Sequence, residues 1–255
     1  MLNYETFGLN HKHKPIMIVH GLFGSGKNWR TISKALANHG RFVIVVDMRN
    51  HGASFWSDDH SYELMAADLI QVADIFGGCV DIIGHSMGGK AAMSLTLMSS
   101  EYVSKLIVVD ISPVRYLHTQ LKNLQAMAEL DLKGIKSRKD AENKLGKAIS
   151  NLSERQFLLQ NLNFKDVSNL KWNINLESLK QNLSNIMDFP DFNQFNSQPT
   201  LFIKGALSHY ILEEHLAVIE TFFPNYELIT VQGAGHWVHV EKKEEFIDSI
   251  LRFLC

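Results

Sequence analysis

One short stretch, residues 84–88, constrains the fold of this chain more than any other. It reads Gly-His-Ser-Met-Gly; a short, β-branched apolar run precedes it, and helix-forming sequence follows from residue 89. A strand, a sharp turn with serine at its centre and a helix form a nucleophile elbow. Glycine is needed at positions 84 and 88 because the backbone packs closely there. We therefore expect the Ser86 hydroxyl to stand clear of a sheet at a helix N-terminus, where free N–H groups favour negative charge.

Strands and helices alternate along most of the chain. Apolar runs of β type occupy residues 16–19, 42–46, 80–83, 106–109, 200–203 and 226–231, and helical patterns occupy 61–75, 212–222 and 244–254. This alternation predicts an α/β fold whose mostly parallel sheet is flanked by helices. In such sheets active sites gather at the carboxyl ends of the strands, and the motifs described here lie at those ends.

Residues 114–197 break the alternation. Amphipathic helices are expected at 121–132, 141–149 and 154–162, and aromatic residues are frequent after them. We expect a helical cap over the strand ends, inserted into a core of residues 1–113 and 198–255; an extra helical layer of the core is the alternative. Four aromatic side chains are candidate substrate contacts: Phe23, Trp172, Phe192 and Trp237.

A serine nucleophile needs a base, and the base needs an orienting acid. His236 lies in a glycine-containing loop after the last strand, so the chain order of serine and histidine fits this arrangement. The commoner position for the acid, in the loop 204–210, holds Ser208. Asp110 ends the strand after the elbow helix, one crossover from Ser86, so the two strands should be neighbours. We predict Asp110 as the acid and Ser208 as a hydrogen-bonding or spacing residue.

Acyl transfer also needs donors for the oxyanion. The N–H of Met87, directly after the nucleophile, is one candidate. The second is the N–H of Leu22, because Gly21 lets the chain turn so that this group points into the site.

A phosphate-binding loop and a metal pair are the competing motifs. Residues 21–28 nearly match a G-x-x-x-x-G-K-[ST] loop, but Asn28 replaces the hydroxyl residue that would contact Mg²⁺. His239, three residues after His236, has no carboxylate or cysteine cluster to support a metal site. We expect neither a metal nor a cofactor.

Charge and cysteine content bound the partners and the compartment. The formal net charge is −2 and no basic cluster occurs, which argues against binding nucleic acid or an anionic membrane. The first residues lack the pattern of a signal peptide, and no apolar run is long enough to span a bilayer. Two cysteines, Cys79 and Cys255, are expected to stay unpaired, which fits the cytoplasm. The oligomeric state is left open.

Five stretches together resemble the α/β-hydrolase superfamily, and more narrowly the YbfF-type bacterial esterases and their mitochondrial relatives of the abhydrolase domain-containing 11 group. These stretches are residues 20–25, 47–52, 84–90, 109–113 and 233–239. The resemblance implies a serine esterase with a helical cap and no cofactor, which acts on short- to medium-chain acyl esters or thioesters as small-molecule substrates. It maps the family's triad to Ser86, Asp110 and His236, and its oxyanion hole to Leu22 and Met87. A lyase or carbon–carbon bond hydrolase that uses the same Ser–His pair is the alternative on this fold.

Overall fold

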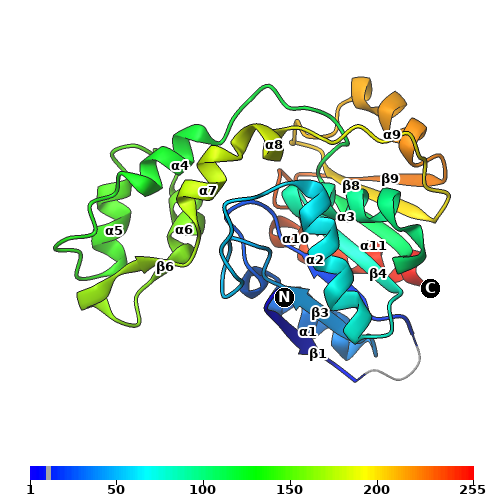
Figure 1. Cartoon of the computed structure of the whole chain (residues 1–255), viewed down its shortest axis with the longest axis horizontal. Coiled ribbons are helices and arrows are strands. Elements are labelled where there is room, and N and C mark those ends of the chain that lie inside the picture. Colours follow the sequence, from blue (N-terminus) through cyan, green and yellow to red (C-terminus); the bar gives the residue numbers. More distant parts are fainter. Residues whose placement is uncertain (10–12) are drawn as a thin grey trace.

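A seven-stranded sheet organises the part of the chain that the computed structural model describes, residues 1–9 and 13–255. Its strand order is β1-β3-β2-β4-β5-β8-β9 (Figure 1). Strand β1 pairs antiparallel with β3, and all other neighbours pair in parallel, which confirms the predicted sheet. The strands are β1 (Tyr4–Phe7), β2 (Ile16–Val19), β3 (Val43–Val46), β4 (Val80–His85), β5 (Val103–Val109), β8 (Thr200–Gly205) and β9 (Tyr226–Val231).

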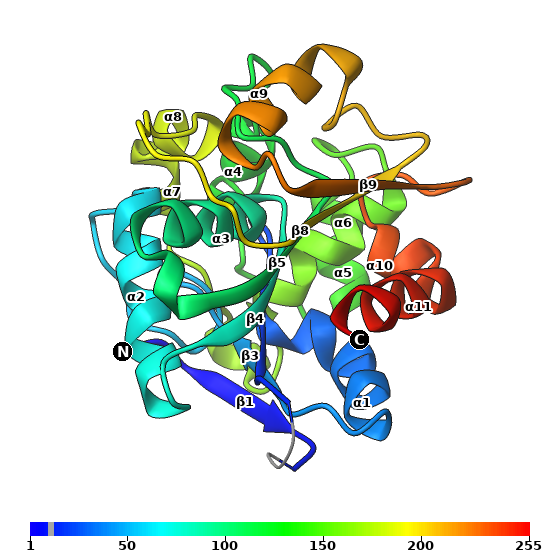
Figure 2. The ribbon, with the colours of Figure 1, turned by 90° about the vertical axis from the view of Figure 1, so that its right-hand side faces the viewer.

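Helices cover both faces of this sheet (Figure 2). On one face lie α2 (Tyr62–Ile75) and α3 (Met87–Met98), which contact each other. On the other face lie α1 (Arg30–Asn38), α10 (Val238–Glu241) and α11 (Lys243–Leu254). Helix α9 (Leu216–Phe222) connects β8 to β9. Helix α2 begins where the sequence predicts, because the Ser61 side chain accepts a hydrogen bond from Leu64 N.

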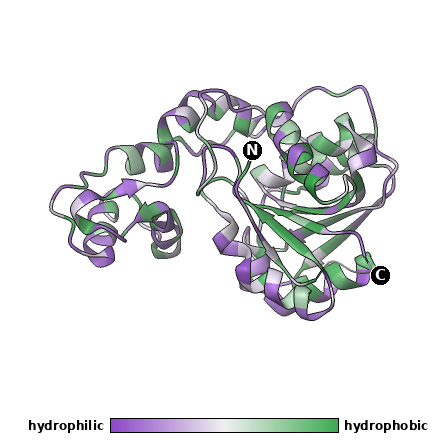
Figure 3. Ribbon diagram, turned by 60° about the horizontal axis from the view of Figure 1, so that its bottom comes forward, coloured by the Kyte–Doolittle hydropathy of each residue, from purple (hydrophilic) through white to green (hydrophobic). Residues whose placement is uncertain are grey.

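The alternation of side chains along each strand creates two separate cores. In β2, Met17 and Val19 pack in the cluster with α2 and α3, whereas Ile16 and Ile18 pack in the cluster with α1 and α11. Period-two geometry requires this, since successive side chains of a strand point to opposite faces. Figure 3 shows the apolar strands between the more polar outer faces of the helices. A strand apolar on both faces is typical of a parallel sheet buried between two helical layers.

Residues 114–187 form a helical lobe, most of which extends away from the sheet in Figure 1. The lobe contacts the sheet domain through Asn161, whose amide donates to the Phe23 carbonyl at 2.8 Å, and through Asn175, whose N–H donates to the Asn50 carbonyl at 2.9 Å. None of the helices within 1–9 and 13–255 is long and apolar enough to cross a bilayer. The elements of the lobe are α4 (Leu121–Ala128), α5 (Arg138–Leu145), α6 (Leu152–Leu158), β6 (Leu162–Asn163), β7 (Lys171–Trp172), α7 (Leu176–Gln181) and α8 (Leu183–Met187).

Helix boundaries in the lobe differ from the sequence prediction because local caps decide them. The side chain of Ser137 accepts from Asp140 N, so α5 begins three residues earlier than expected. Asn151 caps α6 in the same way by accepting from Glu154 N. Helix α4 ends at Ala128, where the chain continues into a turn closed by Asp131, whose carboxylate accepts from Lys133 N.

One buried lysine fastens both connections between the lobe and the sheet domain. Lys90, on α3, donates from Nζ to the carbonyl oxygens of Val114 at 2.8 Å, Met187 at 3.1 Å and Asp188 at 2.7 Å. Val114 lies where the chain enters the lobe, and the other two lie where it leaves. All three N–H donors of the ammonium group are thereby used. Burial lowers the pKa of Lys90 to about 7, which the nearby Asp188 carboxylate opposes.

Candidate active site

The turn around Ser86 has the conformation that the sequence predicts. Ser86 lies between β4 and α3 with φ 54° and ψ −121°, a region that non-glycine residues rarely adopt. A Cβ atom on Gly84 would overlap the Gly88 carbonyl, and one on Gly88 would overlap the Val19 carbonyl. Both glycines are therefore required by close backbone approach, and α3 begins immediately after the serine.

A histidine and a carboxylate from two other strand ends lie beside this turn. His236 follows β9, and its Nδ1 donates to Oδ2 of Asp110 at 2.7 Å. Because Nδ1 carries the proton, the neutral ring has its lone pair on Nε2, where it can accept a proton. Asp110 follows β5, the strand next to β4, as predicted from the single crossover. Asp110 is completely buried, and the His236 side chain is 22% exposed.

The carboxylate of Asp110 has two further donors. Its Oδ1 accepts from Gly205 N at 3.0 Å, and its Oδ2 accepts from the Ser208 hydroxyl. Ser208 is therefore a hydrogen-bonding residue rather than a spacer. These bonds fix the orientation of a buried charge and offset the cost of removing it from water.

His236 is also held in place by two ring systems. His85 Nε2 donates to the His236 carbonyl at 2.9 Å, and the two imidazole rings lie 4.6 Å apart. Tyr210 stacks on His236 with a centroid distance of 4.0 Å and an interplanar angle of 25°. Together these contacts define both the backbone position and the ring plane of His236.

The two predicted oxyanion donors line one cavity with Ser86 and His236. Neither Leu22 N nor Met87 N has an acceptor among residues 1–9 and 13–255. The loop that carries Leu22 is closed by a hydrogen bond from Gly24 N to Gly21 O at 2.9 Å. A Cβ atom on Gly21 would lie 3.1 Å from the Ser86 Cβ, so glycine allows this loop to approach the serine.

The cavity has a volume of about 240 Å³ and lies between the sheet domain and the lobe. Of the four candidate substrate contacts, Phe23 and Trp237 line this cavity, and Phe157 packs against Trp237 at 5.6 Å. Trp172 and Phe192 do not line it: Trp172 belongs to the β6–β7 hairpin, and Phe192 packs against Phe189. Trp172 therefore packs within the lobe, whereas Phe192 packs beside Phe189, whose ring also contacts Phe222 of α9.

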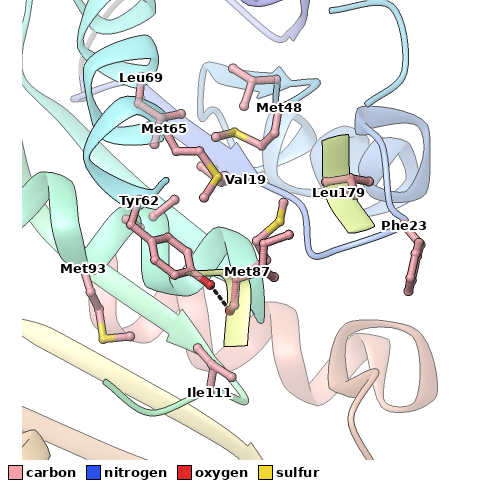
Figure 4. Packing of buried hydrophobic residues seen from close by; sticks show 14 of the residues in the cluster. Val19, Phe23, Met48, Tyr62, Met65, Leu69, Met87, Met93, Ile111 and Leu179 are labelled. Carbon is pink, nitrogen blue, oxygen red and sulfur yellow. Dashed lines mark hydrogen bonds between the residues drawn. The ribbon is translucent and has the colours of Figure 1, made fainter. Parts of the chain in front are cut away.

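Part of the cavity wall is apolar and belongs to the sheet domain's core. Figure 4 shows Tyr62 beside Met87 and Ile111, above Met93. The Tyr62 hydroxyl donates to the Ile186 carbonyl at 2.6 Å, which ties α2 to α8. All of these residues except Met93 line the cavity. This part of the lining therefore offers apolar side chains, and the one side-chain hydroxyl among them, that of Tyr62, is already paired.

One non-glycine residue with positive φ follows each of four neighbouring strands. These residues are Phe23 after β2 (φ 64°), Asn50 after β3 (φ 66°), Ser86 after β4 and Asp110 after β5 (φ 51°). Such conformations cost about 1 kcal/mol or more each and persist only where the surroundings enforce them. The carboxyl ends of these strands, which carry the site, are thus the strained part of the sheet.

The loop that resembles a phosphate-binding motif is folded around a carboxylate. Gly26 N donates to Asp47 Oδ1 at 2.7 Å, and Ala53 N donates to Oδ2 at 2.9 Å. Arg49 forms a buried ion pair with Asp68 at 2.6 Å. A fixed negative charge occupies the place where a phosphate would need N–H donors. Asp47 and Arg49 therefore stabilise these loops locally.

Five buried histidines have pKa values lowered by burial: His20, His51, His60, His85 and His239. For His60 and His239 the pKa falls to about 3. His20 shows why the neutral form is preferred, since Nδ1 bonds to the Gly21 carbonyl at 2.8 Å while Nε2 accepts from Met48 N at 2.9 Å. A proton on Nε2 would destroy the second of these bonds.

Stability should therefore fall as the pH drops below the ordinary histidine pKa of about 6.5. The unfolded chain binds protons that the folded chain excludes. Each buried histidine therefore lowers the free energy of unfolding by up to about 1.4 kcal/mol for each unit by which the pH falls. With five such groups and a total stability of about 5–15 kcal/mol, we expect unfolding near pH 4–5. Urea unfolding between pH 8 and 5 measures this effect. A free energy of unfolding that stays constant from pH 7 to 5 would contradict it.

Two residues of the site were not found by sequence reasoning. Tyr210 is the last residue of the loop 204–210, which the sequence marks only as the commoner position for the acid. The fold alone brings its ring onto His236. Lys90 had a usable signal, because it is a lone lysine in an otherwise apolar helix, residues 87–98. A charged residue in such a helix is expected to be buried only with partners.

The chain is similar to several known proteins in sequence and in structure. A family model described as the alpha/beta hydrolase fold matches residues 14–243. The mouse (Mus musculus) protein named sn-1-specific diacylglycerol lipase ABHD11 is 40% identical, over 100% of this chain and 85% of its own length. Esterase YbfF of Escherichia coli is 34% identical, over 98% and 96%. The solved structure of a marine microorganism esterase superposes with a TM-score of 0.94 at 39% identity, covering 99% of both chains.

Proposed function

The chain belongs to the alpha/beta hydrolase fold family, and from that premise we propose that it is a carboxylic ester hydrolase that uses Ser86, His236 and Asp110. The observation that carries this proposal is the convergence of three strand ends. Ser86 and His236 line one cavity, and the His236–Asp110 hydrogen bond leaves Nε2 as the basic nitrogen. The relatives named esterases support the same reaction class.

In the first half-reaction Ser86 Oγ attacks the ester carbonyl while His236 Nε2 takes the hydroxyl proton. The carbonyl oxygen becomes negatively charged and receives hydrogen bonds from Leu22 N and Met87 N, which are free to donate. The tetrahedral intermediate collapses as the bond to the alcohol breaks. The leaving oxygen takes the proton back from His236, and an acyl-serine remains.

In the second half-reaction water replaces the alcohol. His236 removes a proton from the water, the resulting oxygen attacks the acyl-serine, and the same two N–H groups stabilise the charge. Collapse returns the proton to Ser86 Oγ and releases the carboxylic acid. Asp110 keeps its charge throughout and stabilises the imidazolium that forms in each half. A thioester would react in the same steps with a thiol as the leaving group.

The cavity favours short- to medium-chain acyl groups. A volume of about 240 Å³ is small for a ligand pocket, since such pockets commonly measure about 300–1,000 Å³. We expect the kcat/KM of p-nitrophenyl esters to be highest from acetate to hexanoate and at least about tenfold lower for palmitate. Initial rates below the critical micelle concentration of each ester measure this preference.

Two results would oppose the proposal in different ways. Equal kcat/KM for butyrate and palmitate would contradict the chain-length preference and leave the chemistry intact. Failure to hydrolyse every ester, together with no labelling of Ser86 by a fluorophosphonate, would contradict the esterase itself. Peptide mapping of the labelled protein identifies the serine directly.

A further inference from the structure

The lobe contributes a polar wall to a cavity that is otherwise largely apolar. Gln120, Asn123 and Glu154 line it from the start of α4 and from α6. The Asn123 amide nitrogen donates to Gln120 Oε1 at 2.9 Å and to Glu154 Oε1 at 2.8 Å. Two acceptors on one side of the amide fix its orientation, so the nitrogen faces them and Oδ1 faces away.

At Glu154 and Asn123 this wall presents acceptors. No Lys, Arg or His side chain of the described chain forms an ion pair with Glu154. Lys90 also lines the cavity, but its ammonium donors are used by three backbone carbonyls. The remaining oxygens, Glu154 Oε2 and Asn123 Oδ1, have no donor among residues 1–9 and 13–255. A ligand group that satisfies them has to be a hydrogen-bond donor.

The wall adjoins the place where the leaving alcohol departs. His236 returns its proton to the alcohol oxygen, so the alcohol lies beside that ring. Tyr210 stacks on His236, and its hydroxyl lies 3.1 Å from His118 Nε2. Gln120 and Tyr210 line the same cavity. The polar part of the lining therefore includes both the stacking partner of His236 and the group Gln120, Asn123 and Glu154.

The apolar lining of the cavity suits the acyl chain. The acyl carbonyl has to contact the oxyanion donors Leu22 and Met87, which line the same cavity. Phe23, Ile111 and Ile186 line it with apolar side chains. An acyl chain buried there gains about 25 cal/mol for each Å² removed from water, whereas the polar wall offers no such gain.

From this division we propose that Glu154 and Asn123 select the alcohol part of the ester, favouring alcohols that carry a hydrogen-bond donor and rejecting those that carry an anion. The inference rests on the proposed esterase function. It adds a specificity element that belongs to the lobe and takes no part in bond making. Both residues act on how the alcohol is bound. Their substitution should therefore change the ratio of kcat/KM values between esters of different alcohols.

Three esters of one acid separate these effects. Butyl butanoate and 3-hydroxypropyl butanoate differ by a terminal methyl against a hydroxyl, and 2-carboxyethyl butanoate carries a negative charge at a similar distance. For the wild-type enzyme we expect kcat/KM for the hydroxylated ester to be about tenfold above that for the butyl ester. The kcat/KM for the anionic ester should be at least about tenfold below that for the butyl ester.

Glu154→Gln keeps the shape of the side chain and removes the charge. We expect it to reduce the hydroxyl preference to about threefold or less and to shrink the penalty on the anionic ester by about fivefold or more. The butyl ester should change by less than about twofold. Glu129→Gln is the matched control, since Glu129 follows α4 in the same lobe, is exposed and does not line the cavity. It should leave all three values unchanged.

The ratio between two esters does not depend on how much of a variant is folded, so partial misfolding cannot imitate the result. Unchanged ratios in Glu154→Gln would overturn the inference while hydrolysis itself continues. Equal wild-type rates for the hydroxylated and butyl esters would also overturn it. Absence of hydrolysis for all three esters would instead overturn the proposed esterase function, so the two failures are distinguishable.

Discussion

Ser86→Ala should lower kcat by about 10⁴- to 10⁶-fold with little change in KM for a short-chain ester. The substitution removes the only atom that forms the covalent intermediate, whereas the cavity that binds the ester keeps its lining. The residual rate over water would come from Leu22 N and Met87 N acting on an attacking water molecule. Steady-state hydrolysis of p-nitrophenyl butyrate, with loss of fluorophosphonate labelling, measures the effect.

Ser94→Ala is the matched control for this substitution. Ser94 lies on the same helix, α3, is fully buried, and its hydroxyl has no hydrogen-bond partner among residues 1–9 and 13–255. Its removal should change kcat by less than about twofold, because the residue is outside the cavity. If Ser86→Ala kept more than about a hundredth of the wild-type kcat, the serine would not be the nucleophile.

Asp110→Asn should lower kcat by about 10⁴-fold, the loss known for the equivalent change in serine proteases. Asp110 Oδ2 accepts the proton-bearing Nδ1 of His236, and that contact places the lone pair on Nε2. An amide nitrogen at the same place can only donate, which favours the opposite tautomer and leaves Nε2 protonated. The side-chain volume hardly changes, so the fold should persist. Far-ultraviolet circular dichroism checks this while kcat is measured.

Ser208→Ala gives the comparison that isolates the acid. The Ser208 hydroxyl donates a hydrogen bond to Asp110 and takes no direct part in the proposed reaction. Its loss therefore weakens the support of the carboxylate without changing the tautomer of His236. We expect a reduction of kcat of about three- to thirtyfold. If Ser208→Ala were as damaging as Asp110→Asn, or if Asp110→Asn kept nearly full activity, the assignment of the acid would be wrong.

Local stereochemistry explains why the strand ends were predictable from the sequence. Gly84 and Gly88 are required by backbone overlap that any nucleophile elbow would impose, and that requirement is visible as two letters in the chain. The position of Asp110 was predictable because a single helix between two strands makes them neighbours in a parallel sheet. Both inferences needed only short-range geometry and the handedness of crossovers.

The lobe was less predictable because tertiary packing decides which of its side chains reach the cavity. Trp172 and Phe192 have the aromatic character expected of substrate contacts, yet Trp172 lies in a two-stranded hairpin and Phe192 packs on Phe189. Conversely, Gln120 and Glu154 carry no motif, and only the fold joins them, through the Asn123 side chain that donates to both. Edge strand β1 also went unpredicted, since four residues that are all exposed or half-buried give a weak signal.

The positive φ angles after β2, β3, β4 and β5 lower the free energy of unfolding of this protein. Two of them belong to Ser86 and Asp110, which the proposed reaction needs. If each costs about 1 kcal/mol or more, the four together take up a sizeable part of a typical stability of about 5–15 kcal/mol. At Ser86 and Asp110 the residue that would relieve the strain is glycine, which has no side chain to perform the reaction. Heat resistance and catalysis therefore place opposite demands on the same two positions. A lineage under pressure for thermal stability has to gain it elsewhere in the chain, for example in the exposed helices of the lobe.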